Sequence, residues 1–151
     1  AAAGQILLLE KRRPPAGLYA LDLEGADPQL ARRIATLPER WPEAATPVET
    51  IGDRRYRGAV SAMDLSADGR ALALLSATHW TVYARTPGEA WAAALQRAPA
   101  CAGRLPRRDP RLRRVLYEAI AWDRDQHHLW ISGEQVPAPL LRIAACHRRS
   151  G

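Results

Sequence analysis

The sequence predicts an all-β, mainly antiparallel fold built from about three repeated segments, with one short helix inserted among them. A strand-turn-strand phrase occurs twice, 57 residues apart, and turn residues separate short apolar runs along most of the chain. The longest apolar runs have the length of strands. At 151 residues the chain fits one domain, spanning residues 1–151, with room for a sizeable core.

The first segment, at about residues 5–37, is expected to contain a hairpin and a third strand. QILLLEKR has the apolar content of a buried strand, two prolines end it, and LYALDLEG follows with period-two alternation. ARRIATLP is predicted as the third strand. A helix is the alternative, because Pro28 can start one and apolar residues recur after it at helical spacing. Residues 38–58, rich in proline and charge, are expected to form a long connection with little structure of its own.

The second segment, at about residues 60–105, is predicted to form three strands and a helix. VSAMDLS, ALALLS and WTVYAR are the strands, and Asp68-Gly69 between the first two is a strong hairpin signal. TPGEAWAAALQRAP is rich in alanine and ends at Pro99, which predicts a short helix. CAGRLPRRDPRLRR then reads as a polar connection that leaves room for an outer strand.

The third segment, at about residues 115–143, repeats the order of the second. A strand runs to Trp122, a turn follows, and HLWISG and PLLRI are strands on either side of a proline-containing break. A shift of 57 residues places Ala62 on Ala119 and Leu74 on Ile131. The copy is imperfect, because Gln126 replaces Gly69.

Repeats of about 40–50 residues that each give several antiparallel strands are typical of propeller blades. LSADGRALALLS resembles the SPDGxxLA phrase of bacterial WD-repeat-like and Tol-type β-propellers, and EAIAWDRDQHHLWIS resembles the next such phrase in exported bacterial propellers. The resemblance covers residues 60–85 and 116–143 well, and residues 5–37 loosely. It implies β-propeller-like blades in a periplasmic or extracellular protein. It leaves the function open, because propellers serve binding, scaffolding and hydrolysis alike.

The strand count predicts an incomplete ring. The first segment lacks an inner strand before Gln5, the third lacks an outer strand after Ile143, and about three blades fall short of the usual four to eight. A free partial ring would expose strand edges and an apolar blade face. We therefore expect the partner to be another copy of this chain or the remaining blades of a longer protein.

Charge and hydropathy exclude other classes of function. The net charge is +6, but the arginines are scattered in pairs without interleaved aromatics, which argues against nucleic-acid binding. An arginine-rich α+β nucleic-acid binder would require residues 27–41 and 109–121 to be helices. No apolar run approaches the roughly 18–20 residues of a membrane span, and no basic segment precedes the first apolar run, so we expect neither a membrane span nor a signal peptide in this chain.

The two cysteines, Cys101 and Cys146, lack the spacing of zinc ligands. They are expected either to form one disulfide in an exported protein or to be two buried thiols. We favour the disulfide, because both cysteines lie in irregular segments.

Two carboxylates are candidate ligands for a divalent metal, Ca²⁺ or Mg²⁺. Asp64 lies within the second segment's inner strand and Glu118 just ahead of the third's, and in similar six-bladed hydrolases a glutamate at the channel mouth binds such a metal. The alternative is that Asp64 satisfies backbone groups and Glu118 is solvated. Trp41 and Trp91 lie outside the predicted strands and are candidates for binding a sugar or a partner, with core packing as the alternative.

No catalytic residue can be assigned from the sequence. No serine lies in a G-x-S-x-G context, no glycine-rich phosphate loop is present, and His127 and His128 would point apart in a strand. The first hypothesis is a non-enzymatic propeller segment for ligand or protein binding and assembly. The alternative is a metal-dependent propeller hydrolase, esterase-like or phosphatase-like, with a carboxylate-lined channel.

Overall fold

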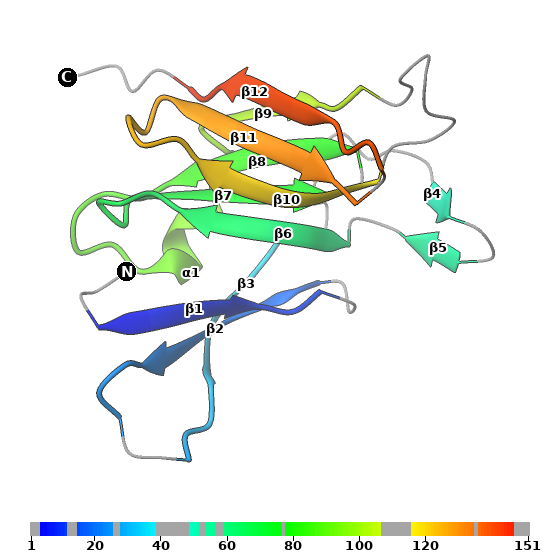
Figure 1. The fold of residues 1–151 in the computed structure, drawn as a ribbon. Helices are drawn as coiled ribbons and strands as arrows, with labels where there is room; N and C mark the ends of the chain where they lie inside the picture. The colour runs from blue at the N-terminus through cyan, green and yellow to red at the C-terminus, as the bar shows by residue number, and fades with distance from the viewer. Residues whose placement is uncertain are drawn as a thin grey trace.

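The computed structural model describes residues 4–11, 15–25, 28–38, 49–51, 54–56, 59–76, 78–106, 116–134 and 136–146. These residues form three antiparallel sheets, one small hairpin and one short helix (Figure 1). The first sheet has the order β1-β2-β3, the second β6-β7-β8-β9 and the third β10-β11-β12. The strands of the sheets are β1 (Gln5–Leu9), β2 (Gly17–Asp22), β3 (Arg32–Thr36), β6 (Val60–Leu65), β7 (Ala71–Ser76), β8 (His79–Ala84), β9 (Cys101–Arg104), β10 (Tyr117–Trp122), β11 (His128–Gly133) and β12 (Leu140–Ala144).

The predicted all-β, mainly antiparallel fold with about three blade-like sheets is therefore confirmed. ARRIATLP forms a strand, β3, and not the alternative helix. The predicted helix is present as α1 (Trp91–Ala94), one turn between β8 and β9. Part of the predicted polar connection after it forms β9, the outer strand of the second sheet.

The expected long connection contains a hairpin. Strand β4 (Glu49–Ile51) pairs antiparallel with β5 (Arg54–Tyr56), so the expectation of little structure is wrong there. The β-branched and aromatic residues of these three-residue runs favour strands, but a proline-rich and charged surrounding hides so short a signal. Residues 39–48, including Trp41, lie outside the described part of the chain.

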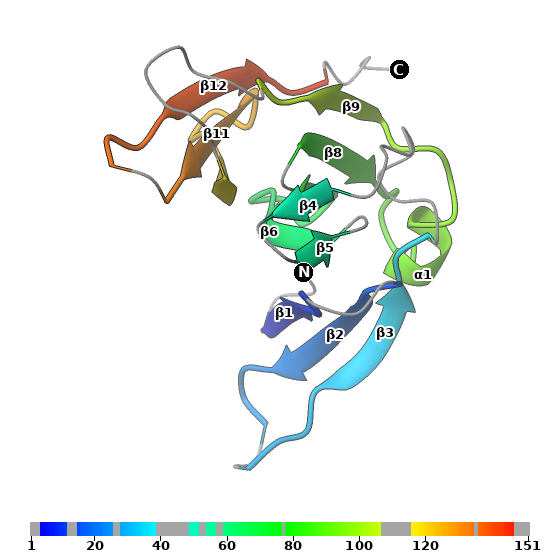
Figure 2. The ribbon, with the colours of Figure 1, turned by 90° about the vertical axis from the view of Figure 1, so that its right-hand side faces the viewer.

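One edge of the stack carries β1, β6 and β10, with β6 between the other two strands (Figure 1). β1 and β6 line a small cleft together, and β6 lies directly beside β10. The first sheet thus has a strand level with the inner strands of the other two sheets, and the expectation that it lacks one differs from the structure. Strands β3, β9 and β12 lie at the opposite, outer edge (Figure 2).

The repeat extends to the hydrogen bonds of the turns. Ser66 and Asp123, 57 positions apart, each precede a turn and each accept hydrogen bonds from the two backbone N–H groups four and five residues later. The N···O distances are 3.2 and 2.8 Å at Ser66 and 2.9 and 3.1 Å at Asp123. Irregularities in the strand pairing also match, since both inner strands shift register at their first residues. Two different side chains therefore build the same turn.

Gln126 adopts the backbone conformation of the glycine that it replaces. The φ angle is 68° at Gly69 and 59° at Gln126, in the left-handed region that disfavours side chains. The Gln126 side chain offsets this, because its Nε2 donates to the carbonyl of Asp123 at 2.7 Å. Its Oε1 accepts from the N–H of Ala67 at 2.8 Å and so joins the turns of the second and third sheets.

The second sheet is buried on both faces. We call its contact with the first sheet the first interface and its contact with the third sheet the second interface. Leu72 and Leu74 of β7 face the first interface, and Leu75 faces the second together with two alanines of the same strand. Burial on both faces explains why ALALLS is continuously apolar and not alternating.

Candidate functional site

Asp64 connects two inner strands through its carboxylate. Oδ1 accepts from the N–H of Leu65 at 2.9 Å, and Oδ2 accepts from the N–H of Trp122 on β10 at 2.7 Å. The side chain is half-buried. Both oxygens therefore have backbone partners, as the structural alternative to a metal ligand expects.

Glu118 is paired with a lysine of the first sheet. Its Oε2 lies 2.7 Å from the Nζ of Lys11, the residue that comes two positions after β1 ends. This ion pair spans the inner edge from the first sheet to the third. Within the described ranges no group of three or more His, Cys, Asp and Glu side chains could hold a metal ion, so a metal at Glu118 and Asp64 stays a prediction.

Trp91 is 4% exposed and packs within the first interface. The guanidinium carbon of Arg85 lies 4.6 Å from the centroid of its ring, a cation–π contact. The side chain thus belongs mainly to the core, and it also contributes to the lining of a cleft at this interface. Trp41, the other candidate, is not among the described residues.

Cys101 and Cys146 are joined in a disulfide, with their Cα atoms 5.7 Å apart. Cys101 begins β9 and Cys146 follows β12, so the bond links the outer edges of the second and third sheets. It lies at the opposite edge from Asp64. The second interface is consequently held at both of its edges.

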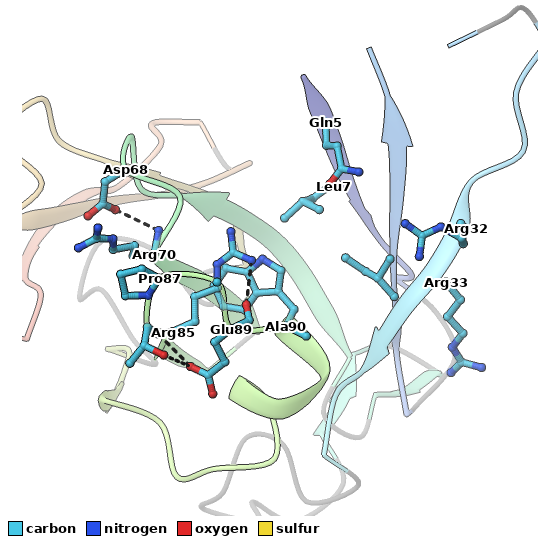
Figure 3. Close-up of a pocket in the computed structure, with 14 residues that line it drawn as sticks. Gln5, Leu7, Arg32, Arg33, Asp68, Arg70, Arg85, Pro87, Glu89 and Ala90 are labelled. Carbon is cyan, nitrogen blue, oxygen red and sulfur yellow. Dashed lines mark hydrogen bonds between the residues drawn. The ribbon is translucent and has the colours of Figure 1, made fainter. Parts of the chain in front are cut away.

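A cleft of about 590 Å³ opens at the first interface, and sequence reasoning did not identify it (Figure 3). One wall comes from β1 and β3, and the other from the turn before β7 and the loop between β8 and α1. Arginines dominate its polar lining. They are Arg32, Arg33, Arg70 and Arg85. The sequence shows them only as scattered arginines, because the cleft exists once two sheets have packed together.

Glu89 in the wall of this cleft is strongly acidic. The hydrogen bond from Arg97, with those from the backbone and hydroxyl of Thr86, lowers the pKa of Glu89 from 4.5 to about 2. The same contact raises the pKa of Arg97. Glu89 is therefore ionised and already neutralised by an internal cation at physiological pH.

Asp123 is the corresponding buried acid beside the second interface. Burial favours its protonated form, but hydrogen bonds from the backbone N–H groups of His128 and His127, and from the His128 ring, outweigh burial and lower the pKa of Asp123. Arg142 lies 3.6 Å from the same carboxylate. The charge of Asp123 thus stabilises a turn.

The chain matches no protein-family model, no curated protein and no solved structure. Among the residues that the structure describes, no helix is long and apolar enough to cross a membrane. The interpretation of function therefore rests on the geometry of the sheets and of the cleft.

Proposed function

We propose that this chain is a non-enzymatic, propeller-like segment that serves binding and assembly, and that its ring is completed by a second copy or by further blades of the same protein. The observation that carries the proposal is that both end sheets turn an apolar face away from the rest of the chain. Each of these faces is of the kind that the internal interfaces bury.

The outward face of the first sheet carries bulky side chains. Ile6 and Leu8 alternate with the inward-facing residues of β1 and are 43% and 41% exposed, and they pair across the sheet with Leu21 and Tyr19. A single sheet cannot cover both of its apolar faces, and exposed patches of this kind mark contact surfaces.

The outward face of the third sheet is flatter. Trp130, 37% exposed, pairs with Ala121 on one side and Arg142 on the other, and Ala119 and Leu140 flank Ser132 in the same way. The second interface has this character too, since it packs small residues of the second sheet against branched residues of the third. The small residues are Ala62, Ala71 and Ala73, and the branched ones are Ile120, Leu129 and Ile131.

The bulky outward face of one copy and the flat outward face of another are thus suited to the same head-to-tail packing. Such a contact joins two different surfaces, and it closes into a ring when the rotation between copies allows. The Cys101–Cys146 disulfide supports a place in an oxidising compartment, periplasmic or extracellular.

Sedimentation equilibrium of the purified chain tests the proposal. We expect a dimer or a larger closed assembly, and we expect Leu8→Glu and Trp130→Glu to weaken it separately, because each places a charge in one half of the contact. An equimolar mixture of these two variants should form a one-to-one complex through the single intact pair of faces. Leu30→Glu is the matched control, since Leu30 is 96% exposed and belongs to neither face. A monodisperse wild-type monomer would count against completion by a second copy.

A further inference from the structure

The cleft at the first interface has the size of a small-molecule site. Its volume of about 590 Å³ lies within the range of roughly 300–1,000 Å³ typical of ligand pockets. Its walls come from two sheets that are separate in the sequence. In Figure 3, Gln5 and Leu7 on β1 face Arg70 and Arg85 across the cleft.

The acidic residues that line the cleft already have partners. Asp68 accepts from the hydroxyl of Ser66 at 2.7 Å and from the N–H of Arg70 at 3.0 Å. Glu89 is ion-paired with Arg97. The negative charges of the lining are therefore committed to the turn and to the loop that carry them.

Arg85 is held in position at the centre of one wall. Its Nε donates to the carbonyl of Gly69 at 2.9 Å, and its Nη1 donates to the carbonyl of Glu89 at 3.3 Å. Stacking on Trp91 fixes the plane of the guanidinium. Three of the five N–H groups of this fork are left for a ligand, and a donor that is already oriented loses little entropy on binding.

Arg70 and Arg32 supply further cationic groups. Both are exposed, and neither side chain has a hydrogen-bond or ion-pair partner in the part of the chain that the structure describes. In Figure 3, Arg70 lies on the same wall as Arg85, whereas Arg32 extends from β3 on the other wall; Arg33 points away. The cleft therefore offers cationic donors from both sides.

Apolar side chains complete the lining. Leu7 and Ile34 come from the first sheet, and Pro87 and Ala90 come from the opposite loop. A ligand that matches this surface combines an anionic group with an apolar body, because guanidinium forks bind carboxylate and phosphate oxygens while apolar walls exclude water.

We propose that this cleft binds a small organic anion, in which a carboxylate or phosphate group contacts Arg70 and Arg85 and an apolar body packs against Leu7 and Ile34. The site lies within one copy of the chain and does not depend on how the ring is completed. Carboxylate and phosphate share the chemistry that an arginine fork recognises, and the experiment below separates them.

Isothermal titration calorimetry with benzoate, phenyl phosphate, inorganic phosphate and benzyl alcohol tests the site. We expect saturable one-to-one binding of benzoate or phenyl phosphate, weaker binding of inorganic phosphate, which lacks the apolar body, and none of benzyl alcohol, which lacks the charge. The preferred member of the first pair identifies the anionic group. Affinity should fall as salt is added.

Arg70→Ala should weaken binding about tenfold, the effect of losing one charge-assisted hydrogen bond. Arg124→Ala is the matched control, because Arg124 is an exposed arginine in the turn of the third sheet and is not part of the cleft. The Leu8→Glu variant should bind like the wild type, so a failure of assembly and a failure of this site are distinguishable. Absence of saturable binding to both organic anions, or equal binding by the Arg70→Ala and wild-type proteins, would overturn the proposal.

Discussion

The first and second interfaces join sheets of the same kind, but they are held together differently. Three links of defined geometry cross the second interface: the hydrogen bond from Trp122 to Asp64 at the inner edge, the bond from Ala67 to Gln126 between the turns, and the disulfide at the outer edge. The first interface relies on apolar packing and opens into a cleft of about 590 Å³.

The difference suggests a division of labour between the two interfaces. The second and third sheets are fixed to each other at both edges and at the turn, so they are expected to unfold as one unit. The first sheet can shift against them, because packing alone tolerates small displacements. A ligand site at the looser of two interfaces is consistent with the general finding that binding regions are drawn from the less stable parts of a protein.

Truncation of two adjacent leucines of β7 compares the interfaces directly and has the largest expected effect. Leu74 and Leu75 are both fully buried, and they face the first and second interface respectively. Each Leu→Ala variant should lose about 2–5 kcal/mol of unfolding free energy, with Leu75→Ala near the upper end, because the linked interface collapses less readily into the cavity. Urea denaturation followed by circular dichroism measures both values.

The two variants control for each other, since they share a strand, a residue type and a degree of burial. A larger loss for Leu74→Ala than for Leu75→Ala would reverse the comparison and show that the first interface is the more rigid of the two.

Removal of the disulfide is expected to bring the second interface closer to the first. The double variant Cys101→Ser, Cys146→Ser should lose about 2–4 kcal/mol, because the unfolded chain is no longer constrained by a cross-link. Amide hydrogen exchange should rise in β10, β11 and β12 toward the rates of β1, β2 and β3. If protection of the third sheet is unchanged, the disulfide is not what pins this sheet.

The sequence predicts the sheets well because their signals are local. Asp68-Gly69, the alanine-rich run before Pro99 and the alternation in LYALDLEG each act over a few residues. The repeat even anticipates the turn at Gln126, where the structure shows the positive φ of the glycine position. A three-residue strand such as β4 falls below the resolution of such patterns.

The site is harder to predict because it depends on contacts between sheets. Nothing near Arg70 or Arg85 in the sequence indicates that β1 and β3 will lie opposite them. The inner-edge place of β1 is missed for the same reason, since the position of a strand in the stack is set by packing of its face and not by its own composition. Trp91 shows the limit for single residues, because its position outside the strands did not reveal that it is buried.

Acid titration sharpens the comparison with the smallest expected effect. The pKa of Glu89 is about 2, below its ordinary value of 4.5, so the folded state binds fewer protons than the unfolded state between these values. The contribution of Glu89 to stability is therefore complete above pH 4.5 and is lost as the pH falls toward 2. In urea denaturation across this range, Glu89→Gln should show a shallower acid loss of stability than the wild type.

Asp123→Asn gives the matching test beside the second interface, where the lowered pKa of Asp123 also predicts stability that is lost on acidification. Added salt distinguishes the two acids. It should reduce the difference between wild type and Glu89→Gln, because the Arg97 partner is about half exposed, with 52% of its side-chain surface accessible to solvent. The Asp123→Asn difference should persist, because backbone N–H groups at 2.9 and 3.1 Å hold that carboxylate in a buried turn. Equal salt sensitivity at both sites would mean that the loop of the first interface and the turn beside the second are stabilised by the same kind of contact.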